Sequence, residues 1–226
     1  MKGLKRLEEG RDMDEWYLRE WAGVDPANGS PLWYTTDENG KRTTTDSYNK
    51  ADRVYCGSAA PKFTGGWMNS FSYKGFTLTA NFDFVYGNLL YNQSRELLDS
   101  DGAYADYNSM KLKSGWKRWE KEGDIATHPK AINGGNKNSN KSSSRYLEKG
   151  NYFSLRNLSL GYSIPEKLCG KLGLQRVNVS CSADNLFTLT PFSGVSPQLS
   201  DSSTDGYAGT IYPLSRRIVL GLNVSF

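Results

Sequence analysis

The sequence has few of the residues that build metal or redox sites. Its 226 residues include three cysteines and one histidine, His128. Cys56, Cys169 and Cys181 show no Cys-x-x-Cys spacing, so we expect them to be unpaired small residues. A lone histidine without such cysteines does not make a usual zinc site. We therefore expect no metal and no cofactor.

Long apolar runs and concentrated charge are also missing. Mean hydropathy is -0.63, and no run approaches the roughly 20 apolar residues of a spanning helix. The formal charge of +4 does not gather in a basic stripe, so we expect no nucleic-acid partner. Residues 1–10 are charged and lack the apolar core of a signal peptide. We therefore expect either a cytoplasmic protein or a longer gene product.

Aromatic residues and glycines are plentiful. Aromatics make up 13% of the chain, and there are 23 glycines, a composition typical of all-β proteins. Apolar and polar residues alternate with a period of two in several segments, which is the pattern of a strand with one apolar face. The alternation predicts six strands, at about residues 13–24, 62–73, 76–90, 151–164, 176–190 and 212–226.

The connections between these strands differ in length. Residues 73–76 form a tight hairpin turn, and a short connection follows residue 164. Long connections occupy about residues 25–61, 91–150 and 191–211. Long and short connections alternate, so an antiparallel order places every long one on the same side. Transmembrane β-barrels have this arrangement, with short periplasmic turns and long external loops.

The number of strands is too small for a closed barrel. Each predicted strand has about 10 to 14 residues, and a strand needs roughly 9 to 11 to cross a bilayer. The smallest bacterial barrels use about eight strands, and an open sheet would expose unpaired edges to lipid. We therefore expect that most of the barrel lies N-terminal to this chain, outside it.

Six segments in order resemble one known family. They are residues 19–29 (REWAGVDPANG), 61–76 (PKFTGGWMNSFSYKGF), 118–129 (RWEKEGDIATHP), 144–162 (SRYLEKGNYFSLRNLSLGY), 184–190 (DNLFTLT) and the closing strand 212–226. Together they resemble the C-terminal barrel portion of the SusC/RagA family of TonB-dependent outer-membrane transporters of Bacteroidetes. The resemblance covers about residues 8–226.

The resemblance implies a fold and a function. It implies an antiparallel transmembrane β-barrel of 22 strands, of which this chain holds about six, without the plug domain and the signal peptide. It implies a place in the cell outer membrane and import of glycans, oligosaccharides or peptides, without enzyme activity. The implied partners are a SusD-like surface lipoprotein, the TonB complex through the missing N-terminal part, the barrel-assembly machinery and outer-membrane lipids.

Three sets of residues receive expected roles. The final strand, with the resemblance, suggests a barrel-assembly signal at Ile218, Leu220, Leu222, Val224 and Phe226. Aromatics near the strand ends suggest two interfacial girdles, formed by Phe71, Tyr73, Phe76, Tyr86, Tyr152, Tyr162 and Tyr212. Polar residues that alternate with the apolar ones are expected to face the lumen, at Asn81, Asp83, Asn157, Asn178, Asp184 and Asn223.

Two other classes of protein are alternatives. A soluble β-rich carbohydrate-binding module could stack sugars on Trp33, Trp67 or Trp116. A hydrolase could use paired carboxylates, either Asp99 with Asp101 or Asp201 with Asp205. Solvated turns explain those aspartates more simply.

Two local predictions concern the long connections. Residues 107–122 carry apolar residues at near-helical spacing and predict a short helix. The Asn39-Gly40 pair predicts a hairpin turn.

Overall fold

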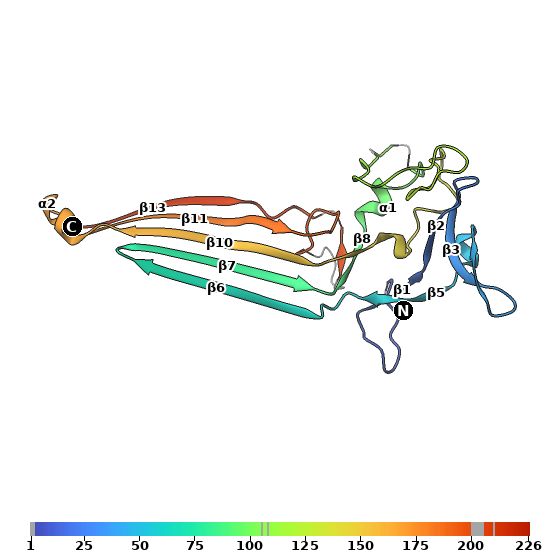
Figure 1. Cartoon of the computed structure of the whole chain (residues 1–226), viewed down its shortest axis with the longest axis horizontal. Coiled ribbons are helices and arrows are strands. Elements are labelled where there is room, and N and C mark those ends of the chain that lie inside the picture. Colours follow the sequence, from blue (N-terminus) through green and yellow to red (C-terminus); the bar gives the residue numbers. More distant parts are fainter. Residues whose placement is uncertain (1–2, 105, 108, 200–205, 210) are drawn as a thin grey trace. The chain divides into compact units, whose positions relative to one another are not determined.

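The computed structural model describes residues 3–104, 106–107, 109–199, 206–209 and 211–226, which form two compact units (Figure 1). The sheet unit comprises Pro61–Gly87, Gly150–Phe192 and Tyr212–Phe226. The loop unit comprises Met1–Ala60, Asn88–Lys149 and Ser193–Ile211. The chain therefore leaves and re-enters the sheet unit through its long connections.

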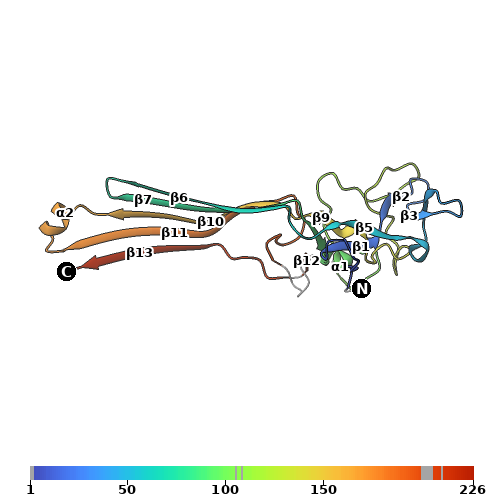
Figure 2. The same ribbon diagram turned by 90° about the horizontal axis from the view of Figure 1, so that it is seen from below.

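The sheet unit is a five-stranded antiparallel sheet with the strand order β13-β11-β10-β7-β6. The strands are β6 (Phe63–Tyr73), β7 (Phe76–Tyr86), β10 (Tyr152–Ser163), β11 (Arg176–Leu189) and β13 (Arg217–Ser225). With 9 to 14 residues each, they exceed the usual strand length of about 5 to 6. Figure 2 shows the same strands from a second direction.

Cross-strand register sorts the side chains of this sheet onto two faces. One row of paired residues runs across β13, β11, β10 and β7 and consists of Leu220, Cys181, Leu160 and Leu78. We call this side the apolar face. The neighbouring row, Val219, Ser182, Ser159 and Thr79, belongs to the polar face. Side chains thus alternate between the two faces along the five strands, apart from one irregularity in β10.

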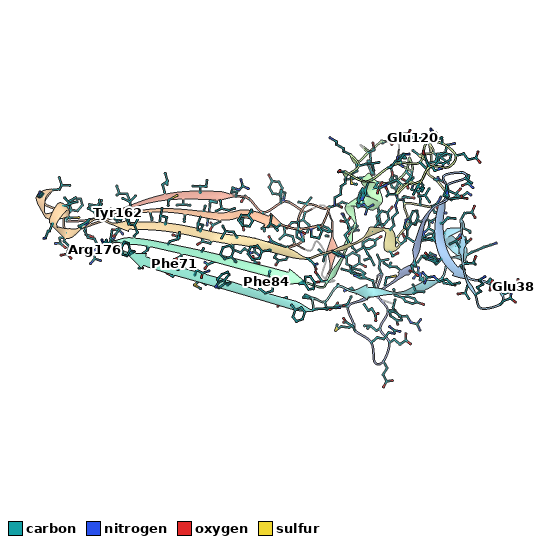
Figure 3. All side chains as sticks on the ribbon, in the orientation of Figure 1. Glu38, Phe71, Phe84, Glu120, Tyr162 and Arg176 are labelled. Carbon is teal, nitrogen blue, oxygen red and sulfur yellow. The ribbon has the colours of Figure 1, made fainter. Side chains whose placement is uncertain are left out.

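Neither face of the sheet is covered within the sheet unit. On the apolar face the exposed fraction is 80% for Leu220, 70% for Leu222 and 63% for Trp67. Figure 3 shows the side chains of this unit projecting from the ribbon, with Phe71, Phe84 and Tyr162 among them. A sheet buries apolar residues only against a second layer, so this unit lacks a core of its own.

Both short connections lie at one end of the sheet. Lys74 and Gly75 form the turn between β6 and β7, with φ of 45° and 88°. The residue pairs Tyr73 with Phe76 and Tyr162 with Phe76 bring the start of β7 beside the end of β10. The connection from β10 to β11 contains α2 (Glu166–Lys171). The predicted segregation of short from long connections is therefore confirmed.

A β-bulge interrupts the alternation in β10. Asn157 lies opposite Asn81, and Leu155 lies opposite Phe82, so Arg156 is an extra residue relative to β7. The extra residue places Leu155 on the apolar face and Ser154, opposite Asp83, on the polar face. Even-numbered residues of β10 thus lie on the apolar face after the bulge and on the polar face before it.

The loop unit is built from three small sheets. One pairs β1 (Glu15–Arg19) with β5 (Arg53–Ser58). The second joins β2 (Trp21–Val24), β3 (Pro31–Thr36) and β4 (Arg42–Thr45). The third joins β12 (Tyr207–Ala208), β8 (Leu89–Asn92) and β9 (Leu147–Lys149). Short helices lie between them: η1 (Tyr48–Lys50), α1 (Ser94–Leu98) and η2 (Ser144–Tyr146).

The loop unit has a buried core. Trp16, Leu18, Ala59, Tyr91 and Tyr146 form it, and each is at most 6% exposed. The Trp16 indole N–H donates to the backbone carbonyl of Leu89 at 2.9 Å, which satisfies its polar atom inside the core. These side chains come from residues 16–18, 59, 91 and 146, so the core holds the long connections together.

Two sequence predictions are wrong in this part of the chain. The strand predicted over 13–24 divides at Glu20 into β1 and β2, which pair with β5 and β3 in separate sheets. It therefore adds no sixth strand to the large sheet. The helix predicted over 107–122 is absent from the described residues there, because the polypeptide forms turns instead and Arg118 bridges to His128.

Two smaller predictions are confirmed. Asn39 and Gly40 lie in the turn between β3 and β4, where the Lys41 carbonyl accepts from the Asp37 N–H at 2.9 Å. Cys56, Cys169 and Cys181 are free thiols. Among the described residues, every helix is too short and too polar to cross a membrane.

Candidate functional site

The polar face gathers all six residues that the sequence assigns to the lumen. Asn178 of β11 pairs with Asn223 of β13. Asn157 of β10 lies between Asp184 of β11 and Asn81 of β7, and Asp83 lies two residues after Asn81 on the same face. The Asn157 amide donates to Asp184 Oδ1 at 2.8 Å. The Arg217 guanidinium donates to Asp184 Oδ2 from Nε at 3.0 Å and from Nη2 at 2.8 Å. The face is thus hydrogen-bonded across neighbouring strands.

A second ion pair lies at the bulge. Arg156 Nε donates to Asp83 Oδ2 at 3.0 Å, and the Tyr152 hydroxyl donates to the same oxygen at 3.3 Å. Tyr152 therefore lies on the polar face, and its assignment to the aromatic girdle is wrong. Strict alternation along β10 puts Tyr152 on the side of Tyr162, but the extra residue Arg156 reverses the faces between them.

The two ion pairs border one polar cavity. Arg156, Asp184, Asn185, Ser215 and Arg217 line a space of about 390 Å³. Asn185 has a positive φ of 53°, and its amide donates to the Ser215 carbonyl at 3.1 Å. Exposed guanidinium and carboxylate groups of this kind need water or a polar ligand around them.

The apolar face carries most of the predicted girdle residues. Phe71, Tyr73, Phe76 and Tyr162 lie at the end with the short connections, and the Phe76 and Tyr162 rings are 4.3 Å apart. Tyr86 lies at the opposite end, facing Phe63. Tyr212 precedes β13, outside any strand, and is 88% exposed.

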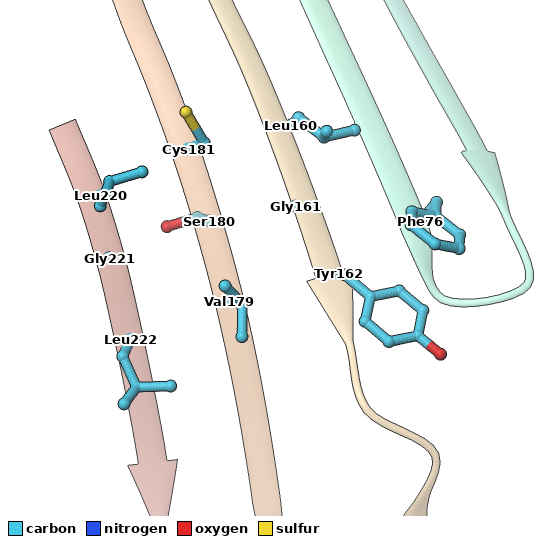
Figure 4. A pocket seen from close by; sticks show the side chains of 10 residues that line it. All are labelled: Phe76, Leu160, Gly161, Tyr162, Val179, Ser180, Cys181, Leu220, Gly221 and Leu222. Atoms are coloured by element: carbon cyan, nitrogen blue, oxygen red, sulfur yellow. The ribbon is translucent and has the colours of Figure 1, made fainter. Parts of the chain in front are cut away.

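Figure 4 shows a shallow groove of about 430 Å³ in this sheet. Leu160, Val179, Leu220 and Leu222 supply apolar walls. A Cβ added at Gly161 or Gly221 would lie on the opposite, polar face, where the hydroxyl of Thr77 or Ser180 would have to move to admit it. The groove carries no charged side chain.

The proposed assembly residues lie at the edge of the sheet. Ile218, Leu220, Leu222 and Val224 share the apolar face of β13. Phe226 follows the strand and is 84% exposed. Because β13 pairs only with β11 among the described strands, its other edge presents unpaired backbone groups.

The loop unit contains a buried ionic cluster that the sequence analysis missed. Arg95 Nη2 donates to Asp99 Oδ2 at 2.8 Å, and Arg118 Nη1 donates to Asp101 Oδ1 at 2.6 Å. Arg145 forms an ion pair with Asp101 and lies 3.4 Å from Asp99. Both aspartate side chains are 0% exposed. The sequence contains Arg118 and Arg145 within two family-like segments, but no spacing joins them to the aspartates.

His128 belongs to the same cluster. Its Nε2 lies 2.9 Å from Asp99 Oδ2, and its Nδ1 lies 2.8 Å from the Thr127 hydroxyl. Burial alone would raise the pKa of Asp99, but the bond to His128 and the charge of Arg145 lower it to about 2. A carboxylate held ionised, as Asp99 is, makes a poor general acid. Asp101 is bound by Arg118 and Arg145, so the structure does not support paired acid–base carboxylates at Asp99 and Asp101. Asp201 and Asp205 lie outside the described residues.

The tryptophans proposed for sugar stacking do not form a platform. Trp33 is 0% exposed, whereas Trp67 is on the apolar face of the sheet. Trp116 packs against Arg95, at 4.4 Å from the guanidinium carbon to the ring centroid, and against His128. Sugar binding by exposed, parallel indoles therefore has no geometric support.

Comparison with known sequences finds relatives of one kind. No protein-family model matches the chain. It is 32% identical over 181 residues to "TonB-dependent receptor P39" of Formosa agariphila, covering 77% of this chain and 17% of that protein. It is 29% identical over 246 residues to "TonB-dependent receptor P3" of the same organism, covering 97% of this chain and 23% of that protein.

Comparison with solved structures agrees. The chain matches the RagAB peptide transporter with a TM-score of 0.75 and 28% identity, covering 94% of this chain and 23% of that chain. It matches the RagAB peptide importer in the open-open state with a TM-score of 0.75 and 25% identity, covering 98% and 25%. The chain thus spans about a quarter or less of these relatives. The names of these relatives describe receptors and a transporter. The all-β chain belongs to the SusC/RagA-like family of TonB-dependent transporters.

Proposed function

We propose that the chain forms part of the barrel wall and the external loops of an outer-membrane transporter. The single observation that carries this proposal is the one-layer sheet. Its strands of 9 to 14 residues are long enough to cross a bilayer, which takes roughly 9 to 11. One face is apolar and exposed, and the other is polar and ionic. Lipid and a water-filled lumen provide the two environments that such faces need.

The finer features of the proposal follow from the family. The transporter imports oligosaccharides or peptides together with a SusD-like surface lipoprotein, and the TonB complex energises it. The similar solved structures are of RagAB, a peptide importer. The loop unit, with its own core and ionic cluster, would keep a fixed shape outside the membrane, where a lipoprotein and a substrate can contact it.

In this proposal Ile218, Leu220, Leu222, Val224 and Phe226 are read by the barrel-assembly machinery through edge pairing. Phe71, Tyr73, Phe76 and Tyr162 form the periplasmic aromatic band, with Tyr86 and Tyr212 on the external side. The six polar-face residues line the lumen.

Two adjacent residues provide a direct test. Cys181 lies on the apolar face and Ser182 on the polar face. In the full-length protein in outer membranes, with Cys56 and Cys169 replaced by serine, a charged thiol reagent should leave Cys181 unmodified. The matched variant, with Cys181→Ser and Ser182→Cys added, should be modified rapidly. Equal labelling of the two positions would contradict a membrane-spanning sheet, because a soluble sheet exposes both.

A further inference from the structure

The connection between β10 and β11 has a surface that the transporter proposal does not use. Its helix α2 buries Cys169, which is 1% exposed and whose thiol lies 3.7 Å from the Ile164 carbonyl. On the outside, Leu168 is 51% exposed and Leu172 is 75% exposed. Leu168 lies within α2, and Leu172 caps its C-terminal end about one turn later.

Basic residues accompany the exposed leucines. Lys167 and Lys171 are exposed and also four residues apart, so they form a stripe next to the leucines. Lys74, in the neighbouring β6–β7 turn, and Arg176, at the start of β11, are exposed at the same end of the sheet. Within α2 the acidic residue is Glu166, in its first turn. The surface therefore carries a marked positive excess.

We infer that α2 is an interfacial anchor that binds the anionic phosphates of membrane phospholipids. An apolar stripe with lysines beside it is the pattern of a helix that lies in the headgroup layer. Long lysine side chains can rest their methylene groups on the apolar layer while their charges reach phosphate. The inference rests on the proposed membrane function, because the sheet must first be inserted.

The position of α2 in the sheet unit supports a lipid rather than a soluble ligand. Figures 1 and 2 both show α2 at the end of the sheet where the short connections lie. The aromatic pair of Phe76 and Tyr162 lies at this end, on the apolar face, and Tyr162 directly precedes the connection. Tyrosine in such a band lies at headgroup depth in membrane barrels. The lysines of α2 are thus one short segment from the expected headgroup layer.

The test compares lipid binding by variants of the full-length protein, purified from outer membranes. Native mass spectrometry would measure the ratio of phosphatidylglycerol to phosphatidylcholine adducts from mixed micelles. Each juxtamembrane lysine contributes on the order of a five-fold preference for anionic lipid. The double variant Lys167→Gln, Lys171→Gln should therefore reduce the ratio by roughly ten-fold or more. Leu168→Ser with Leu172→Ser should reduce adducts of both lipids.

The matched control is Lys41→Gln with Lys50→Gln, which removes the same charge from two exposed lysines of the loop unit. It should leave the adduct ratio unchanged. An unchanged ratio in the α2 variant overturns the inference, including the case in which a protein docks there instead. A ratio that falls equally in the control also overturns it, because net charge alone would then explain the result. Failure of the wild-type protein to enter the membrane would contradict the transporter proposal itself.

Discussion

The two units of this chain stabilise their side chains in opposite ways. The loop unit buries Trp16 and Tyr146 at 0% exposure and pairs its buried aspartates with arginines. The sheet unit leaves its large apolar side chains exposed, with Leu220 at 80%. The first unit therefore buries its apolar core and its ionic cluster within itself. The second can be stable only where another layer, here proposed to be lipid, covers its apolar face.

The largest effect is expected from removing one partner of the buried cluster. Arg145→Met leaves Asp99 and Asp101 without their shared guanidinium, and breaking a buried pair from one side costs about 3–5 kcal/mol. Hydrogen–deuterium exchange of the full-length protein should show loss of protection in residues 95–101 and 139–146. The strands of the sheet unit should stay protected.

Arg42→Met is the control for this prediction. Arg42 pairs with Glu20 at 2.9 Å but is 61% exposed, so the cost should be under about 1 kcal/mol. Equal losses in the two variants would show that burial does not distinguish the cluster from a surface pair.

A charge on the apolar face should have the next largest effect. Leu220→Arg should cost about 2–4 kcal/mol for folding into a bilayer, because arginine is expensive near the midplane of the lipid face. Ser182→Arg, on the polar face, should cost much less. Urea titration of the full-length protein folded into vesicles would measure both. Equal losses of folding free energy in the two variants would contradict the proposal that only the apolar face contacts lipid.

Acid should weaken the loop unit before the sheet unit. The pKa of Asp99 is lowered to about 2 in the folded protein, against roughly 3.9 when unfolded. Its stabilising contribution is therefore complete above about pH 4 and is lost as the pH falls towards 2, a change on the order of 2 kcal/mol.

Exchange rates corrected for their intrinsic pH dependence would reveal this loss in residues 95–101. Asp99→Asn, which cannot ionise, should remove this part of the pH dependence. An unchanged acid transition in the variant would assign the effect to another group.

The smallest effect concerns the bulge. Tyr152→Phe removes a 3.3 Å hydrogen bond to Asp83 and should cost about 0.5–1 kcal/mol. Tyr162→Phe, on the apolar face, removes a hydroxyl of the same strand and should change stability less than Tyr152→Phe does. The urea concentration at the midpoint of unfolding, measured in vesicles, would compare the stability of the two variants. A larger cost at Tyr162 would contradict the placement of Tyr152 on the polar face.

Sequence reasoning predicts the sheet unit well, because alternation is a local property. The apolar rows through Leu220 and Phe82 and the polar residues from Asn81 to Asn223 follow directly from a period of two. The prediction fails at Tyr152, because one extra residue in β10 changes the face and no local pattern marks Arg156 as extra.

The loop unit is harder to predict because its contacts join distant residues. Asp101 meets Arg145 across 44 positions, and Trp16 meets Leu89 across 73. Short strands such as β1 and β2 show too little alternation to reveal where one ends, so the pattern predicts a single strand over residues 13–24. The resemblance to a family does not indicate how such segments pair.

The bulge at Arg156 also bears on how the chain can vary. Even-numbered residues of β10 lie on the polar face before the bulge and on the apolar face after it. Deleting this one residue would leave Phe153 and Leu155 on the apolar face and Ser154 on the polar face, because Leu155 and Asn157 already lie opposite the adjacent residues Phe82 and Asn81. A residue lost or gained in a regular stretch of β10 would instead reverse the faces on one side of the change, so differences in length are expected at the bulge or in the connections.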